Sequence, residues 1–222
     1  MPFNTTGQND ALSGGIGNAI THIGVNTLVT GPPSDTTPGT GATAATTEAT
    51  GGSPAYARQA VTWAAPASGQ RSNTGTLTFD VPAGTYGFLT FWSASTGNSG
   101  TQYRGWAPIN GSVKGFFSVD TTLANDALFS VAHGLADGDR VILMNVFAES
   151  LPTGLVEGAA YYVVNSTTNT FKVSNSAGGA AVDITAVGGG EGYFQKIIPE
   201  TFASQGQITV AASQLVLDAT GI

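Results

Sequence analysis

The residues that could carry chemistry are few, and they lie far apart in this sequence. The chain has two histidines and no cysteine, which excludes disulfides, zinc–thiolate sites and cysteine catalysis. Catalytic triads and metal sites need a histidine that the fold places beside a nucleophile or a carboxylate. His133 precedes Gly134 and is expected to end a strand and to hydrogen-bond a turn. His22 lies in an expected strand, where a structural or interface role fits it best.

Carboxylates offer two further possibilities, a calcium site and a pair of catalytic acids. Asp137 and Asp139 flank a glycine, but calcium loops need a longer ladder of oxygen ligands, and Arg140 adds opposing charge. A tight hairpin turn explains this Asp-Gly better. Glycoside cleavage needs two carboxylates around the scissile bond. Four glutamates lie in or near expected loops without an aromatic-rich cluster: Glu149, Glu157, Glu191 and Glu200. The sequence therefore predicts no catalytic residue, no metal ligand and no cofactor.

Charge and glycine patterns also argue against nucleic acid, nucleotides and membranes as partners. Only 9% of residues are charged, the net charge is −7, and the seven basic residues are scattered singly, so no basic stripe exists for nucleic-acid phosphates. The glycines at positions 14, 15 and 17 lack a phosphate-loop lysine and a preceding strand. No apolar run approaches the roughly 20 residues of a membrane span. The N-terminus shows no basic region followed by an apolar core, so no signal peptide is expected.

The elements that must position these residues are expected to be strands. Threonine suits a pleated, half-exposed surface, and glycine suits turns. Residues 75–81 alternate between apolar and polar side chains, and residues 86–92 form the near-continuous apolar run of a central strand. Residues 8–19 are the only helix candidate. Residues 30–53 are rich in Thr, Gly, Pro and Ala and are expected to form a long surface loop.

A second domain is expected to interrupt the first. Six short strands are expected at 115–120, 127–132, 139–146, 159–165, 169–174 and 180–185. Six strands over this length predict a small barrel or sandwich, and the glycine run 188–190 is expected to end it. The strand patterns after residue 195 are too few to fold alone. The expected fold is therefore all-β: a discontinuous, jelly-roll-like β-sandwich of residues 1–111 and 195–222, with an inserted domain of residues 112–194.

Aromatic side chains gather between residues 79 and 106, and most of them are expected to lie in the core of the first domain. Tyr103 and Trp106 border the inserted domain, which makes them candidates for a hinge or a subunit contact. Together with His22, they form the set of possible interface residues.

Two parts of the chain resemble modules of actinobacteriophage virion proteins of the tail fibre or minor tail type. The first resemblance is carried by GGSPAYARQAVTW (51–63), TFDVPAG (78–84) and the closing segment of residues 199–210. The second, to a small β module of phage surface proteins, is carried by AHGL (132–135), GDRV (138–141), YYVVN (161–165) and NTFKVS (169–174). Together they cover most of the chain beyond residue 50.

The resemblance implies a non-enzymatic structural protein on the outer surface of the phage particle, made in the host cytoplasm. A minor tail or tail fibre-type protein for host adhesion is the first expectation. A capsid decoration protein that stabilises the head shell and a glycan-binding module are the alternatives. The implied partners are further copies of the chain, as a homo-oligomer expected to be a trimer, other tail or capsid proteins of the virion, and a host surface glycan. The family supplies no catalytic residue to carry over.

Overall fold

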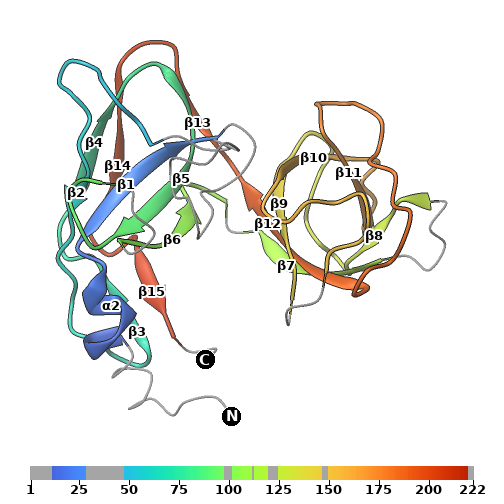
Figure 1. Cartoon of the computed structure of the whole chain (residues 1–222), viewed down its shortest axis with the longest axis horizontal. Coiled ribbons are helices and arrows are strands. Elements are labelled where there is room, and N and C mark those ends of the chain that lie inside the picture. Colours follow the sequence, from blue (N-terminus) through green and yellow to red (C-terminus); the bar gives the residue numbers. More distant parts are fainter. Residues whose placement is uncertain are drawn as a thin grey trace. The chain divides into compact units, whose positions relative to one another are not determined.

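The fold is almost entirely built of strands and turns (Figure 1). The computed structural model describes residues 12–28, 48–97, 102–111, 113–119, 125–146 and 150–219. The all-β prediction is confirmed, and so is a short N-terminal helix, because residues 12–14 and α2 (Ile16–Ala19) are helical. Residues 8–11 of the expected helix lie outside the described residues.

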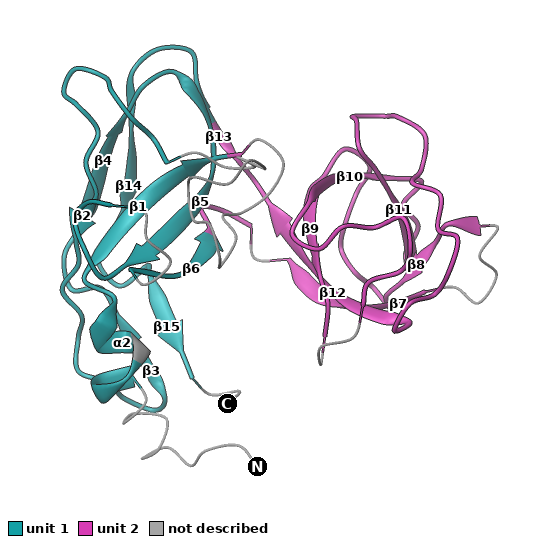
Figure 2. Ribbon diagram, viewed as in Figure 1, with its two compact units in different colours: residues 1–27, 33–107, 201–222 teal, residues 28–32, 108–200 magenta. Residues whose placement is uncertain are grey.

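The chain divides into two compact units, which Figure 2 shows in different colours. Unit 1 comprises residues 1–27, 33–107 and 201–222, and unit 2 comprises residues 28–32 and 108–200. The larger part of unit 2 is therefore inserted between two parts of unit 1. The expected limits of the inserted domain, 112 and 194, lie four and six residues inside the observed limits of 108 and 200.

Unit 1 contains a five-stranded sheet in the order β13-β5-β1-β2, with β6 also paired to β5. Its strands are β1 (His22–Thr27), β2 (Gln59–Ala60), β5 (Gly84–Trp92), β6 (Tyr103–Pro108) and β13 (Glu200–Phe202). Two further two-stranded sheets pair β4 (Leu77–Val81) with β14 (Gly206–Val210) and β3 (Gln70–Ser72) with β15 (Val216–Asp218). The C-terminal segment thus supplies partners to strands formed much earlier in the chain.

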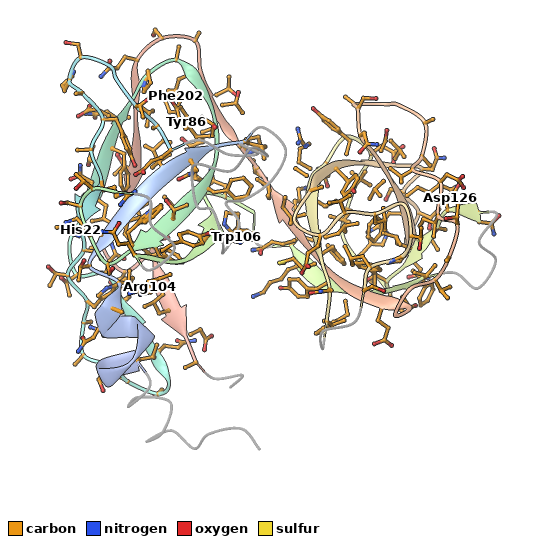
Figure 3. The ribbon with its side chains drawn as sticks, viewed as in Figure 1. His22, Tyr86, Arg104, Trp106, Asp126 and Phe202 are labelled. Atoms are coloured by element: carbon orange, nitrogen blue, oxygen red, sulfur yellow. The ribbon has the colours of Figure 1, made fainter. Side chains whose placement is uncertain are left out.

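The two strands that the sequence predicts most clearly, β4 and β5, have different patterns of side-chain burial. In β4, buried residues alternate with half-buried ones, as the sequence pattern predicts for a strand with one covered face. In β5, every residue from Tyr86 to Trp92 is buried, and the strand lies inside the sheet, with β1 on one edge and β13 on the other. The Tyr86 ring also packs against Phe202 of β13, with ring centroids 6.2 Å apart (Figure 3).

Unit 2 is a closed barrel of six strands in the order β10-β11-β8-β7-β12-β9. The strands are β7 (Lys114–Val119), β8 (Leu128–Phe129), β9 (Arg140–Met144), β10 (Ala160–Val164), β11 (Thr170–Ser174) and β12 (Glu191–Ile197). Buried side chains fill the interior, and the ring of Phe171 contacts those of Phe117, His133 and Phe194. The first strand, β7, and the last, β12, lie side by side in the barrel. A barrel of this size is a packed core rather than a channel.

The sixth strand of the barrel is not the one expected from the sequence. Residues 180–185 contain no strand, so that prediction is wrong. Single hydrogen bonds hold residues 180–185 in place. The Ile184 amide donates to the carboxylate of Asp126 at 2.8 Å, and Asp126 is labelled in Figure 3. The Val182 amide donates to the Val173 carbonyl. The strand that closes the barrel is β12, which pairs with β7 on one side and β9 on the other.

The expected surface loop of residues 30–53 is confirmed at residues 50–53, which are exposed and outside any strand, and is wrong at residues 48 and 49. Ala49 is only 3% exposed, and its amide donates to the carbonyl of Val25 in β1. Glu48 forms an isolated bridge with Asn26 of the same strand. Residues 48 and 49 therefore belong to the body of unit 1, while residues 30–47 lie outside the described residues.

Gly192 of β12 is required by the ring that lies over it. It pairs directly with Phe117 of β7, and a Cβ at position 192 would overlap the Phe117 ring inside the barrel. Gly192→Ala should therefore displace a core side chain and lower the free energy of unfolding of unit 2 by about 1–3 kcal/mol. Amide hydrogen exchange of barrel residues measures the loss. The control is Gly75→Ala in unit 1, where a Cβ meets no atom within 4 Å; an unchanged barrel in Gly192→Ala would contradict the prediction.

Candidate functional site

A buried ion pair between Arg58 and Glu48 is the most enclosed charged contact in the described part of unit 1. Their side chains are 4% and 19% exposed, and the contact is bidentate, with Arg58 Nη2 2.6 Å from Glu48 Oε2 and Nε 2.7 Å from Oε1. The guanidinium carbon also lies 3.6 Å from the centroid of a Trp92 ring. Bidentate geometry and cation–π stacking both favour arginine over lysine at this position.

Two of the three remaining N–H donors of Arg58 are occupied by backbone carbonyls. Nη1 donates to Ala94 at 3.1 Å and Nη2 to Gly97 at 2.6 Å, so four of the five N–H groups of the guanidinium are used. An open depression of about 380 Å³ lies beside the pair, lined among others by Thr50 and Tyr56. Because the charged groups in its wall are already paired, the cluster acts as a clamp between segments of unit 1.

Tyr56 completes the cluster. Its hydroxyl donates to Glu48 Oε1 at 2.8 Å and accepts the amide of Val25 at 2.8 Å. Burial, followed by the negative charge of Glu48, raises the pKa of Tyr56 well above its usual range. The phenol therefore stays protonated in the folded protein at pH values where an unfolded tyrosine would ionise.

This raised pKa makes unit 1 sensitive to alkali. Above about pH 10 the unfolded state releases the Tyr56 proton and the folded state keeps it, so the free energy of unfolding should fall as pH rises, by about 1.4 kcal/mol per pH unit for this group. Tyr56→Phe should lose stability at neutral pH, because the Val25 amide loses its acceptor, and should show a shallower decline between about pH 9 and about pH 11. Denaturant titrations followed by tryptophan fluorescence measure both effects. Equal slopes in the two proteins would contradict the prediction.

His133 closes a turn, as the sequence predicts. Its Nδ1 accepts the amide of Leu135 at 3.0 Å, and its Nε2 lies 3.2 Å from the carbonyl oxygen of Thr170. These partners correspond to a neutral ring with the proton on Nε2, because an amide N–H requires an acceptor. The ring is 6% exposed and packs on Phe171, so it is a core residue of the barrel.

The carboxylates near His133 are also used by the fold. Asp137 accepts the amide of Ser166 at 2.7 Å. Asp139 accepts the amide of Ala136 at 2.9 Å and forms an ion pair with Lys196 at 2.7 Å. Among the described residues, no group of three or more histidines and carboxylates could hold a metal ion.

The glutamates considered for acid catalysis have separate surroundings. Glu149 lies outside the described residues. Glu157 accepts the amide of Asn145 at 3.4 Å, and Glu200 accepts the side-chain amide of Asn110 at 2.9 Å. The partner in each of these two contacts is an asparagine, so neither contact places a second carboxylate beside Glu157 or Glu200. Glu191 is exposed at the first position of β12.

The three predicted interface residues lie in the sheet of unit 1. Tyr103 is 6% exposed and its ring lies 5.2 Å from that of Trp92, so within one chain it is a core residue without a free surface. Trp106 is partly exposed and meets Phe88 edge to face at 5.4 Å (Figure 3). His22 is partly exposed at the start of β1. The contact role predicted for Tyr103, Trp106 and His22 stays a prediction.

Among the described residues, the most exposed aromatic side chain lies on the outside of the barrel and was not singled out from the sequence. Phe116 of β7 is 65% exposed, and Tyr193 pairs directly with it on β12, with ring centroids 5.5 Å apart and a near-perpendicular angle of 74°. Phe129, the last residue of β8, and Val131, two residues beyond it, are also exposed. The signal was present, because two consecutive phenylalanines in a strand must point to opposite faces.

The outward-facing residues of these two strands form one surface, which we call the outer β7–β12 face. It consists of Lys114, Phe116 and Ser118 of β7 and Glu191, Tyr193 and Gln195 of β12. Their neighbours in sequence, such as Phe117 and Phe194, point into the core. The face therefore presents an aromatic pair between polar side chains on a rigid support.

Comparisons with known protein families, with curated proteins and with solved structures found no match to this chain. Among the described residues, no helix has the length and apolar character needed to cross a membrane.

Proposed function

We propose that this chain is a non-enzymatic structural protein on the outer surface of a bacteriophage particle, of the minor tail or tail fibre type, that serves adhesion to the host. The observation that supports this most is how its polar groups are used. Arg58, Glu48, His133 and Asp139 are each engaged in bonds that hold one segment of the fold to another. In enzymes, side chains of these types often form a reactive centre. Here the bonds of these four side chains connect segments of the fold.

The two-unit organisation also fits this proposal. Each unit has its own buried residues, and the barrel is filled by side chains, so its outer surface is what it offers to a partner. A surface protein of a particle must remain folded outside the cell, and closed barrels and paired strands leave few free edges. The sequence resemblance to virion proteins points to the same role.

Localisation on the particle tests the proposal directly. Antibodies raised against the barrel should label the tail tip of intact virions in immunogold electron microscopy. If the antibodies label the head instead, the protein is a capsid decoration protein and not a tail protein. Particles without label, from a lysate in which the protein is present, would overturn the virion assignment.

Adhesion has its own measurement. The purified chain should bind intact host cells and should slow adsorption of the phage when it is added in excess. A glycan array identifies the receptor class if cell binding is lost after removal of surface polysaccharide. A labelled tail combined with no cell binding would restrict the role to assembly.

A further inference from the structure

The outer β7–β12 face carries two charges of opposite sign at diagonal corners. Lys114 pairs with Gln195 at one end of the ladder, and Glu191 pairs with Ser118 at the other. Both charged side chains are exposed, and neither forms an ion pair with any other described residue. Four residues of strand separate the ends, about 14 Å, so the two charges are too far apart to pair within one chain.

The aromatic pair lies midway between these charges. Phe116 and Tyr193 occupy the central register position of the face, directly opposite each other. Phe116 is exposed and Tyr193 is half-buried. An aromatic pair that reaches the surface of a sheet is typical of the centre of a protein contact, whereas polar residues are typical of its rim. The face is therefore organised as an apolar centre with one positive and one negative corner.

This pattern is complementary to itself. A two-fold axis that lies in the plane of the contact, perpendicular to the line from Lys114 to Glu191, exchanges the two corners. It places Lys114 of each copy against Glu191 of the other and brings the two Phe116–Tyr193 pairs together. Such an isologous contact is the commonest way in which identical chains associate.

We propose that the outer β7–β12 face is a two-fold contact between two copies of this chain. The occupant is a second copy because the charges on the face match each other under the two-fold rotation. The contact makes the species in solution a dimer, in place of the trimer expected from the sequence. It does not depend on the location of the protein on the particle, so its failure and that of the proposed function are separate results.

Charge reversal at the corners tests the proposal in the full-length chain. Analytical ultracentrifugation over a range of concentrations should show a species with twice the 22.4 kDa mass of the chain. Lys114→Glu and Glu191→Lys should each weaken the dimer by about tenfold or more, because each creates two like-charge contacts per dimer. The double variant Lys114→Glu/Glu191→Lys should restore association, since it exchanges the charges and recovers both pairs.

Two further variants separate the contact from general effects. Phe116→Ser should abolish the dimer, whereas Val156→Ser, which changes another exposed apolar residue of unit 2, should leave it intact. Circular dichroism verifies that each variant is folded. A monomer at all concentrations, a trimer, or a double variant that associates no better than the single ones would overturn the proposal.

Discussion

Arg58→Ala should lower the free energy of unfolding of unit 1 by about 3–5 kcal/mol, because it leaves the carboxylate of Glu48 partly buried without its partner. The same change removes the donors to Ala94 and Gly97 and the stacking on Trp92. Tryptophan fluorescence during denaturant unfolding is a selective probe, because the three tryptophans, at 63, 92 and 106, all belong to unit 1.

Two controls show whether the loss comes from the unpaired charge. Arg58→Met combined with Glu48→Leu should be less destabilising than Arg58→Ala, since neither charge then remains buried. Lys196→Met breaks the Asp139 pair in the other unit and should leave the tryptophan transition unchanged. If Arg58→Ala unfolds at the same denaturant concentration as the unmodified protein, the clamp contributes nothing to stability.

Phe171→Ala should destabilise the barrel of unit 2 by about 3–5 kcal/mol. Phe171 is fully buried and its ring contacts those of Phe117, His133 and Phe194, so truncation opens a cavity that several elements would have to move to fill. Amide hydrogen exchange of barrel residues should report the loss. Phe171→Leu retains most of the volume and should cost distinctly less.

The tryptophans again provide a check on where the effect lies. The tryptophan transition of unit 1 should keep its midpoint in Phe171→Ala, because Phe171 belongs to the core of the barrel. Barrel amides as well protected in Phe171→Ala as in the unmodified chain would contradict the predicted cavity cost.

Local sequence patterns were sufficient to predict a strand where its buried and exposed side chains follow a regular pattern. The alternation at 75–81 and the apolar run at 86–92 correspond to β4 and β5, in which buried residues alternate and run continuously, respectively. The barrel strands up to β11 were also expected near their observed positions. In these segments, side-chain periodicity and turn residues specify the strand without knowledge of its partner.

Long-range pairing is what the sequence could not show. β12 becomes a strand because β7 and β9 border it on both sides, and its glycine at 192 and glycine run before it resemble a domain end. Glu48 lies in a stretch dominated by Thr, Gly and Pro, and only the return of the chain to β1 brings it to Arg58. The candidate sites therefore depend on contacts between segments distant in sequence.

The pairing of the first and last barrel strands has a consequence for inheritance. Because β7 and β12 are hydrogen-bonded neighbours, the inserted unit enters and leaves through adjacent chain ends: the Asn110 carbonyl accepts the Ile198 amide at 3.1 Å. A gene segment that encodes residues 109–199, between β6 and β13, could be replaced by another whose product also begins and ends on paired strands. The strand order of the surrounding sheet would then stay the same. Recombination at these two junctions would give descendants a new barrel surface on an inherited frame.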